Sequence, residues 1–237
     1  MVTDTPIVLR SGIRDEQPGC GHLLTPSTGG FEGLTTGTWA CDNDCFHGFK
    51  PEPYLRMLET VRGRTGCVFV TAPDVLENWT ETRTLFDTWQ PVIKAHQLPV
   101  AVVLQDGVTH HDIPWTDIDS VFIGGSTTFK LSRRTASFSG YARAMGLWVH
   151  MGRVNSLRRY NYASDIGCHS VDGSTFSWYP DEGMRILHRW QQQKRMHFVC
   201  HVSTCTERGL LDNQWRRRTQ RSTDGVSAVS RVQRQVS

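Results

Sequence analysis

Short apolar runs recur along this sequence, and most of them end in a polar residue or a glycine. Apolar and polar positions do not alternate inside the runs, which is typical of parallel strands that are buried on both faces. Five runs are clear, a sixth is shorter, and two further segments, near the start and near residue 200, have the same character. In chain order they are IVLRS (7–11), GTWACD (37–42), CVFVTAPD (67–74), PVAVVLQDG (99–107), SVFIGG (120–125), LWVHMGR (147–153), CHSVDG (168–173) and HFVCHVS (197–203).

Segments with the features of helices lie between the runs. The segment 51–63 has a proline near its start and a glycine at its end, as helices commonly do. The segment 79–97 also predicts a helix, although Pro91 predicts a break or a kink within it. The segment 155–167 repeats the strand-to-helix pattern.

This alternation of strands and helices predicts an α/β protein with a parallel sheet. Eight strands is the number of a closed TIM-type (β/α)8 barrel, and we expect such a barrel, complete or abbreviated, over residues 1–211. No Gly-x-Gly-x-x-Gly motif follows the first strand, which argues against the alternative, an open doubly wound sheet with a dinucleotide site. The segment 212–237 is rich in Arg, Gln, Ser and Thr, and we expect it to be a flexible basic tail.

Composition agrees with a globular, soluble protein. Of the 237 residues, 38% are hydrophobic and 21% are charged. No apolar run is long enough to span a membrane and the first residues lack a secretory signal, so we expect a cytoplasmic protein with no membrane partner. Seven cysteines favour reduced thiols over a disulfide framework. The net charge of +3 is uneven, because the segment 208–237 holds seven Arg against two Asp.

The ends of the apolar runs carry the candidate chemistry, because a barrel builds its active site at the C-terminal ends of its strands. A single Asp or Gly in such a place commonly just ends a strand and caps the next helix. The set as a whole is more informative than any member. It comprises Asp42, Asp74, Gln105, Asp106, Gly124, Gly125, Gly152, Arg153 and Asp172.

Together these motifs resemble the tRNA-guanine transglycosylase family, and more closely its DNA-acting relatives, the 7-deazaguanine DNA transglycosylases of phages and bacterial genomic islands. The resemblance covers about residues 38–176. Asp-Asn-Asp-Cys-Phe at 42–46 stands in place of the family's Asp-Ser-Gly-Gly-Phe motif, and VTAPDV, VVLQDG, FIGGS and SVDGS follow in the family's order. FIGGSTTFKLS and WVHMGRVNSLRRYNYA look specific to the DNA-acting branch.

The resemblance implies a pentosyltransferase that exchanges a base at C1′ through a covalent intermediate. Asp172 would be the nucleophile, and Asp42 would be the general acid/base, as the paired carboxyls of retaining glycosidases are. Asp74 would accept the N1–H and the N2 amine of guanine, while Gln105 and the Gly125 N–H would serve O6. The implied substrate-binding set is Asp74, Gln105, Gly124, Gly125, Phe46 as a stacking ring, Met151, Gly152 and Arg153.

The sequence departs from the tRNA-acting enzymes at the family's zinc signature, Cys-x-Cys-x-x-Cys with a distant His, which is absent. Cys200, His201 and Cys205, with His197, form an alternative metal-binding set, but their spacing is not a standard one. We therefore expect no metal and no cofactor. The missing signature and the short chain favour DNA and a 7-deazaguanine base such as preQ0 as partners, in the cytoplasm of a host if a phage encodes the protein.

Three other functions stay open. The same exchange on tRNA is the nearest, and a nucleoside or glycoside hydrolase, in which water resolves the intermediate, is another enzymatic alternative. A non-catalytic subunit that binds nucleic acid belongs to a different class. The presence of both Asp42 and Asp172 argues against that subunit, and Gln105 with the paired glycines favours base exchange over hydrolysis.

Overall fold

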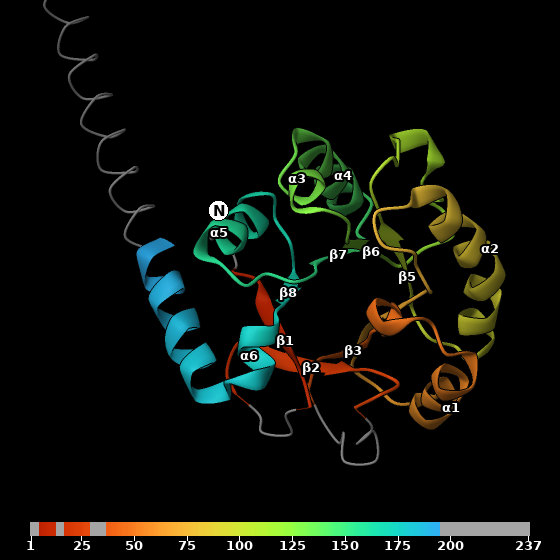
Figure 1. The fold of residues 1–237 in the computed structure, drawn as a ribbon, viewed down its shortest axis with the longest axis horizontal. Helices are drawn as coiled ribbons and strands as arrows, with labels where there is room; N and C mark the ends of the chain where they lie inside the picture. Colours follow the sequence, from red (N-terminus) through yellow and green to blue (C-terminus); the bar gives the residue numbers. More distant parts are fainter. Residues whose placement is uncertain (1–4, 13–16, 29–36, 195–237) are drawn as a thin grey trace, which may run out of the picture. The chain divides into compact units, whose positions relative to one another are not determined.

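The computed structural model of this protein describes residues 5–12, 17–28 and 37–194. Within the unit formed by residues 1–190, eight parallel strands make a closed barrel, in which each strand pairs with the next and β8 pairs with β1 (Figure 1). The predicted α/β barrel is confirmed. The strands are β1 (Ile7–Ser11), β2 (Cys20–Leu24), β3 (Trp39–Cys41), β4 (Cys67–Thr71), β5 (Val100–Leu104), β6 (Ser120–Ile123), β7 (Trp148–Met151) and β8 (Ser170–Asp172).

One strand of the barrel differs from the prediction. The strand β2 was missed, because a glycine and a histidine interrupt its short apolar pattern. The barrel then closes through β8 and β1, with Val8 opposite Val171, so the segment 197–203 is not needed as an eighth strand. That segment lies outside the described residues, as do the predicted domain boundary after residue 211 and the predicted tail.

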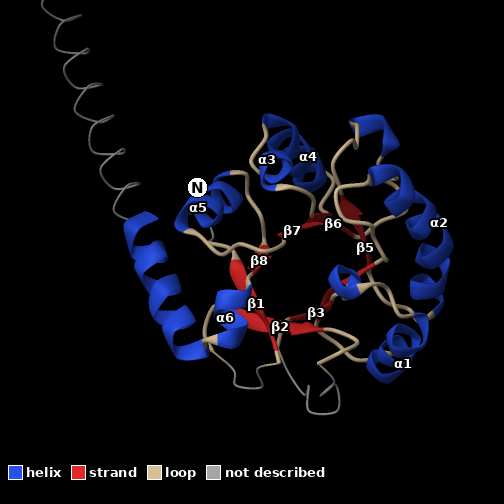
Figure 2. Ribbon diagram, viewed as in Figure 1, coloured by secondary structure: helices blue, strands red, loops and turns tan. Residues whose placement is uncertain are grey.

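Helices lie around most of the ring of strands (Figure 2). In α1 the buried residues Tyr54, Met57, Leu58 and Val61 follow the helical repeat, and a proline occupies the first turn, where no N–H is needed. The helices are α1 (Pro51–Val61), α2 (Trp79–Ala95), α3 (Thr127–Lys130), α4 (Arg133–Ala144), α5 (Leu157–Asp165) and α6 (Ser174–Trp178), with short 3-10 turns η2 (Cys45–His47) and η3 (His110–Asp112) and a further helix over 180–194.

Of the break or kink predicted at Pro91, the break is wrong, because α2 continues through this residue to Ala95. A proline inside a helix costs about 3 kcal/mol. The helix retains its buried face, with Phe86 before the proline and Ile93 after it, and burial of such side chains contributes about 1.5–3 kcal/mol each. Packing against the barrel on both sides of the proline therefore offsets its cost.

The barrel is abbreviated on one side. No helix occurs in the described parts of the connections from β1 to β2 and from β2 to β3. These parts are residues 12, 17–19, 25–28 and 37–38. An α-helix follows each of β3, β4, β6, β7 and β8, and the 3-10 turn η3 follows β5. The strand ends that carry the candidate residues therefore lie outside the side of the barrel on which no helix is described. Among the described residues, no helix is both long and apolar enough to cross a membrane.

Two apolar clusters sit on the two faces of the strands. The larger one lies between the strands and the surrounding helices. The smaller one packs from several strands around Phe69 and Phe122, whose rings meet edge to face with centroids 6.0 Å apart. The strands are therefore covered on both sides, which explains why their sequences do not alternate.

Candidate active site

A cavity of about 160 Å³ lies at the C-terminal ends of the strands β3 to β8. The structure brings eight of the ten predicted site residues into its wall. They are Asp42, Phe46, Asp74, Gln105, Gly124, Gly152, Arg153 and Asp172. Three of the eight are carboxylic acids, which arrive from strands far apart in the sequence.

Asp172 ends β8 and receives hydrogen bonds on both carboxylate oxygens. The Nε2 atom of His150 lies 2.9 Å from Oδ2, and the backbone N–H of Arg153 donates to Oδ1 over 3.0 Å. Burial disfavours the ionised form, but the hydrogen bond and electrostatic attraction of His150, the Arg153 N–H and the Lys130 ammonium outweigh it and hold the pKa of Asp172 below its usual value. Asp172 is therefore a carboxylate at neutral pH, as a nucleophile requires.

A directed chain of hydrogen bonds stands behind this carboxylate. Trp148 Nε1, which only donates, lies 2.8 Å from the Ser170 hydroxyl, and that hydroxyl lies 2.8 Å from Nδ1 of His150. If Ser170 gives its hydrogen to Nδ1, the neutral imidazole carries its proton on Nε2; in the imidazolium form both nitrogens carry one. In either form Nε2–H donates to Asp172, so His150, which is fully buried, fixes the orientation of the carboxylate.

Asp42 follows β3 and lies close to other acids. Its Oδ1 accepts the backbone N–H of Asn43 over 2.7 Å and the hydroxyl of Thr71 over 3.4 Å. Burial, together with the carboxylates of Asp172 and Asp74, raises the pKa of Asp42 to about 7. Asp42 therefore gains or loses a proton near neutral pH, which suits a general acid/base.

Asp74 is held by two side-chain amides. Asn43 donates to Oδ1 over 2.7 Å and Gln105 donates to Oδ2 over 2.5 Å, while the amide oxygen of Gln105 accepts the backbone N–H of Glu77 over 2.9 Å. Burial raises the pKa of Asp74, and the bonds from Asn43 and Gln105 partly oppose this effect. Because a carboxylate oxygen has two lone pairs, Asp74, which lines the cavity, can accept further hydrogen bonds from a ligand.

The paired glycines permit close packing beside this amide. A Cβ atom on Gly124 would lie 2.8 Å from Cγ1 of Val103 and 2.9 Å from Nε2 of Gln105, so any side chain there would displace the amide that holds Asp74. Gly125 has a φ of 72° and does not line the cavity. Its carbonyl accepts a hydrogen bond from the guanidinium of Arg153 over 3.3 Å.

Met151 and Phe46 occupy opposite environments. Met151 is fully buried in the cluster between strands and helices, so its side chain supports the barrel and does not line the cavity. Phe46 lines the cavity and is 62% exposed, with the guanidinium carbon of Arg153 lying 5.7 Å from its ring centroid. An exposed ring beside a cation provides a surface on which a flat base can stack.

The site residues that escaped the sequence analysis include Asn43, Lys130 and His150. A histidine inside an otherwise apolar strand is a usable signal, because a buried polar side chain needs a partner. Asn43 and Lys130 carried no comparable signal, since each lies in a polar stretch that is typical of loops and helix ends.

The described residues hold no group of three or more His, Cys, Asp or Glu side chains that would bind a metal ion. The alternative set around Cys200 lies outside the described residues. The five described cysteines are free, and burial raises the pKa of Cys45, which lines the cavity, so its thiol is not activated.

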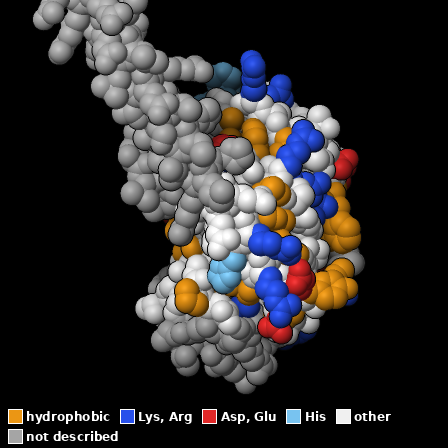
Figure 3. Space-filling view, turned by 90° about the vertical axis from the view of Figure 1, so that its left-hand side faces the viewer, with side chains coloured by type: hydrophobic (Ala, Val, Ile, Leu, Met, Phe, Trp, Pro, Cys, Tyr) orange, Lys and Arg blue, Asp and Glu red, His pale blue; other side chains and the backbone are white. Residues whose placement is uncertain are grey.

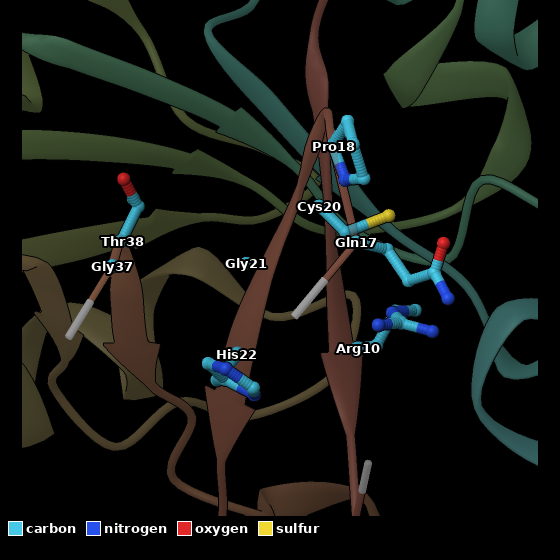
Figure 4. A pocket seen from close by; sticks show the side chains of 8 residues that line it. All are labelled: Arg10, Gln17, Pro18, Cys20, Gly21, His22, Gly37 and Thr38. Carbon is cyan, nitrogen blue, oxygen red and sulfur yellow. The ribbon is translucent and has the colours of Figure 1, made fainter. Parts of the chain in front are cut away.

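A second cavity, of about 340 Å³, lies along the first three strands (Figure 4). Its wall includes Arg10 of β1, Cys20 and His22 of β2, and Thr38 just before β3. Cys20 and Thr38 lie where their strands begin, whereas barrel enzymes carry out their chemistry where strands end. We therefore assign the candidate active site to the cavity with the three acids.

No protein-family model matches this sequence, and no curated protein matches it. Among solved structures, the chain is similar to the Bacillus subtilis YkuI protein, which has an EAL domain and was solved in complex with its substrate c-di-GMP and calcium. The sequences are 12% identical, the TM-score is 0.39, and the match covers 68% of this chain and 45% of that one. This chain thus spans less than half of that protein, and so distant a likeness says nothing about the chemistry of the cavity.

Proposed function

We propose that this protein exchanges guanine in DNA for a 7-deazaguanine such as preQ0, through a covalent aspartyl-glycosyl intermediate on Asp172. One observation supports the proposal most. Two carboxyl groups face the same cavity with pKa values displaced in opposite directions, Asp42 to about 7 and Asp172 below its usual value. Such a separation divides the roles of acid and nucleophile between two otherwise equal side chains.

The reaction divides into two displacements at C1′. In the first, the Asp172 carboxylate forms a bond to C1′ while the bond from C1′ to guanine breaks, and the departing base takes the electron pair and the Asp42 proton. In the second, the ring N–H of the 7-deazaguanine gives its proton to Asp42 as that nitrogen attacks C1′, and Asp172 leaves as a carboxylate. Two displacements retain the configuration at C1′ and return both acids to their initial states.

The size of the cavity is consistent with a single base as its occupant. Its volume of about 160 Å³ is small beside the roughly 300–1,000 Å³ of ordinary ligand pockets. The sugar and phosphates would then remain outside, so the target nucleotide must leave the base stack before it reaches Asp172. In the wall of the cavity, Asp74 offers two acceptors to the adjacent N–H donors of guanine, and adenine lacks that pair of donors.

Substitution Asp74→Asn tests this recognition. An amide offers one acceptor and one donor where the guanine edge presents only donors, so one buried pair becomes repulsive. We expect kcat/KM for guanine exchange to fall roughly 10- to 100-fold, or about 1–3 kcal/mol. Steady-state kinetics on an oligonucleotide with one target guanine measure the effect, and an unchanged kcat/KM would place base recognition elsewhere.

DNA is favoured over tRNA by the missing zinc signature and by the two motifs that resemble the DNA-acting branch. Figure 3 shows Lys and Arg side chains in several groups on one face, with acidic and apolar side chains between them. Such dispersed charge is common on protein surfaces and does not by itself select a nucleic acid. The choice of substrate therefore rests on the sequence.

Direct comparison of substrates tests the proposed function. Incubated with a 7-deazaguanine base, the protein should release guanine from DNA and place the deazaguanine in the same strand, as nucleoside mass spectrometry detects. We expect little or no exchange into tRNA. Exchange into tRNA alone would reverse the substrate, guanine release that leaves an abasic site would indicate a hydrolase, and binding without release of guanine would indicate a non-catalytic subunit.

A further inference from the structure

Lys130 is the last residue of α3, and the mechanism above does not use it. Its side chain lines the active-site cavity, yet only 2% of its surface is exposed. Among the described residues its ammonium nitrogen has no hydrogen-bond or ion-pair partner within the usual distances. Lys is rarely buried unless it is paired, so an unpaired ammonium in a cavity wall points to a ligand that supplies the missing acceptor.

The charges around Lys130 favour an anion as that ligand. Burial first, and then the nearby guanidiniums of Arg153 and Arg159, lower the pKa of Lys130 to about 8, while Asp172 and Asp106 act in the opposite direction. The three cations, which we call the cationic rim, thus lie close together, and two of them, Lys130 and Arg153, line the cavity. An added anion would relieve both the desolvation of Lys130 and the repulsion among the three side chains.

The two neighbouring acids already have partners. Both carboxylate oxygens of Asp106 accept hydrogen bonds from Ser126. The hydroxyl of Ser126 donates to Oδ1 over 2.6 Å, and the backbone N–H of Ser126 donates to Oδ2 over 2.7 Å. Asp172 accepts hydrogen bonds from His150 and from the backbone N–H of Arg153, as described above. Neither acid is within ion-pair distance of Lys130, so neither takes the place of an external anion.

The framework that carries the cations is fixed by hydrogen bonds. One guanidinium nitrogen of Arg159 donates to the backbone carbonyl of Arg153 over 2.9 Å, and the other donates to the hydroxyl of Thr127 over 2.5 Å. Arg159 therefore ties the start of α3 to the loop that follows β7. Arg153 itself has a left-handed backbone, with φ of 57°, which is uncommon for a side chain of this size. The rim is thus held in place before any ligand binds.

We propose that Lys130, with Arg153 and Arg159, binds a phosphodiester group that flanks the target nucleotide. The inference rests on the proposed function, because Asp172 would attack C1′ of the sugar to which both flanking phosphates are joined. Lys130 ends the helix α3 that follows β6, and Arg153 and Arg159 lie in the loop and the helix α5 that follow β7. Asp74 and Gln105, the groups proposed to read the base, follow β4 and β5. The cationic rim therefore faces the sugar–phosphate side of the cavity.

A binding experiment with neutral linkages tests the subsite. Full-length protein carrying Asp42→Asn, in which base release is expected to be slow, is titrated with fluorescent single-stranded oligodeoxynucleotides that contain one guanine. Each phosphate flanking the guanine is replaced in turn by an uncharged methylphosphonate, and a third oligonucleotide carries the replacement several nucleotides away. Lys130→Gln is compared with the parent, and Lys94→Gln, at an exposed position on α2, is the control.

We expect Lys130→Gln to weaken binding of the all-phosphate oligonucleotide about tenfold, the loss of a charge-assisted hydrogen bond. On the oligonucleotide with one particular flanking methylphosphonate, the same substitution should have little effect, because the phosphate partner is already gone. On the oligonucleotide with the distant methylphosphonate, Lys130→Gln should weaken binding as much as on the all-phosphate oligonucleotide. Lys94→Gln should show no dependence on which phosphate is replaced. Lys130→Arg, which keeps the charge, should retain most of the affinity and the coupling. Thermal unfolding confirms that each variant folds.

An equal effect of Lys130→Gln on all three modified oligonucleotides, or no effect on any, overturns the subsite. A loss that appears only in exchange assays and changes with the substituent at carbon 7 of the incoming base assigns Lys130 to the base instead. The proposed function is tested separately, by the covalent Asp172 adduct in the unsubstituted protein. If Lys130 is coupled to a flanking phosphate but no adduct forms, the proposed function fails and the subsite stands. If the adduct forms without this coupling, only the subsite fails.

Discussion

Asp172→Asn is expected to abolish base exchange and to leave no protein linked to DNA when turnover is stopped by denaturation. An amide at this position keeps the size of the side chain and its contact with His150, but it does not attack C1′. Removal of a nucleophile commonly lowers kcat by about 10⁴-fold or more. Denaturing gel electrophoresis of a labelled oligonucleotide measures the adduct, and nucleoside mass spectrometry measures the exchange.

The matched control is Asp87→Asn, which makes the same chemical change on the exposed face of α2 and breaks only a surface pair with Arg83. It should exchange guanine and form the adduct at the normal rate. Turnover in Asp172→Asn close to that of the control would exclude covalent catalysis by Asp172. An adduct that persists in the variant would assign the nucleophile to another side chain.

Asp42→Asn is expected to slow guanine release by about 10²- to 10⁴-fold, the usual contribution of a general acid. With a pKa of about 7, Asp42 is protonated below this pH and loses its proton above it, so adduct formation in the unsubstituted protein should fall about tenfold for each pH unit above 7. In the variant this limb of the pH profile should disappear. Single-turnover rates of guanine release between pH 5 and 9 decide the point, and a limb that persists would assign the titration to another group.

The same substitution should stabilise the fold at alkaline pH. The native protein keeps the Asp42 proton up to about pH 7, whereas the unfolded chain releases it near pH 4, so the native state binds more protons between these values. The free energy of unfolding therefore falls as pH rises through this window. Asp42→Asn removes that loss, and we expect a gain on the order of 2–4 kcal/mol at pH 8 and none at pH 3. Denaturant unfolding at both pH values, with Asp87→Asn as the control, measures it.

The loss of activity and the gain of stability have one physical origin. Three carboxyl groups, Asp42, Asp74 and Asp172, share one small cavity, and their mutual repulsion adds to the cost of burial. Such an arrangement opposes folding when every group is ionised, and it keeps one proton available near neutral pH.

The sequence by itself determined the class of fold and the ends of most strands. Buried parallel strands leave unbroken apolar runs, and the polar residues that follow them mark where each strand stops. This local signal placed Asp42, Asp74, Gln105 and Asp172 at strand ends, and the closed barrel then required these ends to meet. It failed for β2, whose glycine packs against the backbone before β3 and whose histidine interrupts the apolar pattern.

Only the tertiary structure decided how the site residues act on one another. The opposite displacements of the Asp42 and Asp172 pKa values depend on distances between strands that are 130 residues apart in the sequence, and no local pattern encodes such distances. The same holds for His150, which looks like an irregularity in β7 until its ring is seen to reach Asp172, and for Lys130, which the folded chain buries in the wall of the cavity. Electrostatic interactions depend on the distance between groups and on how much solvent surrounds them. Both are set only when the chain folds.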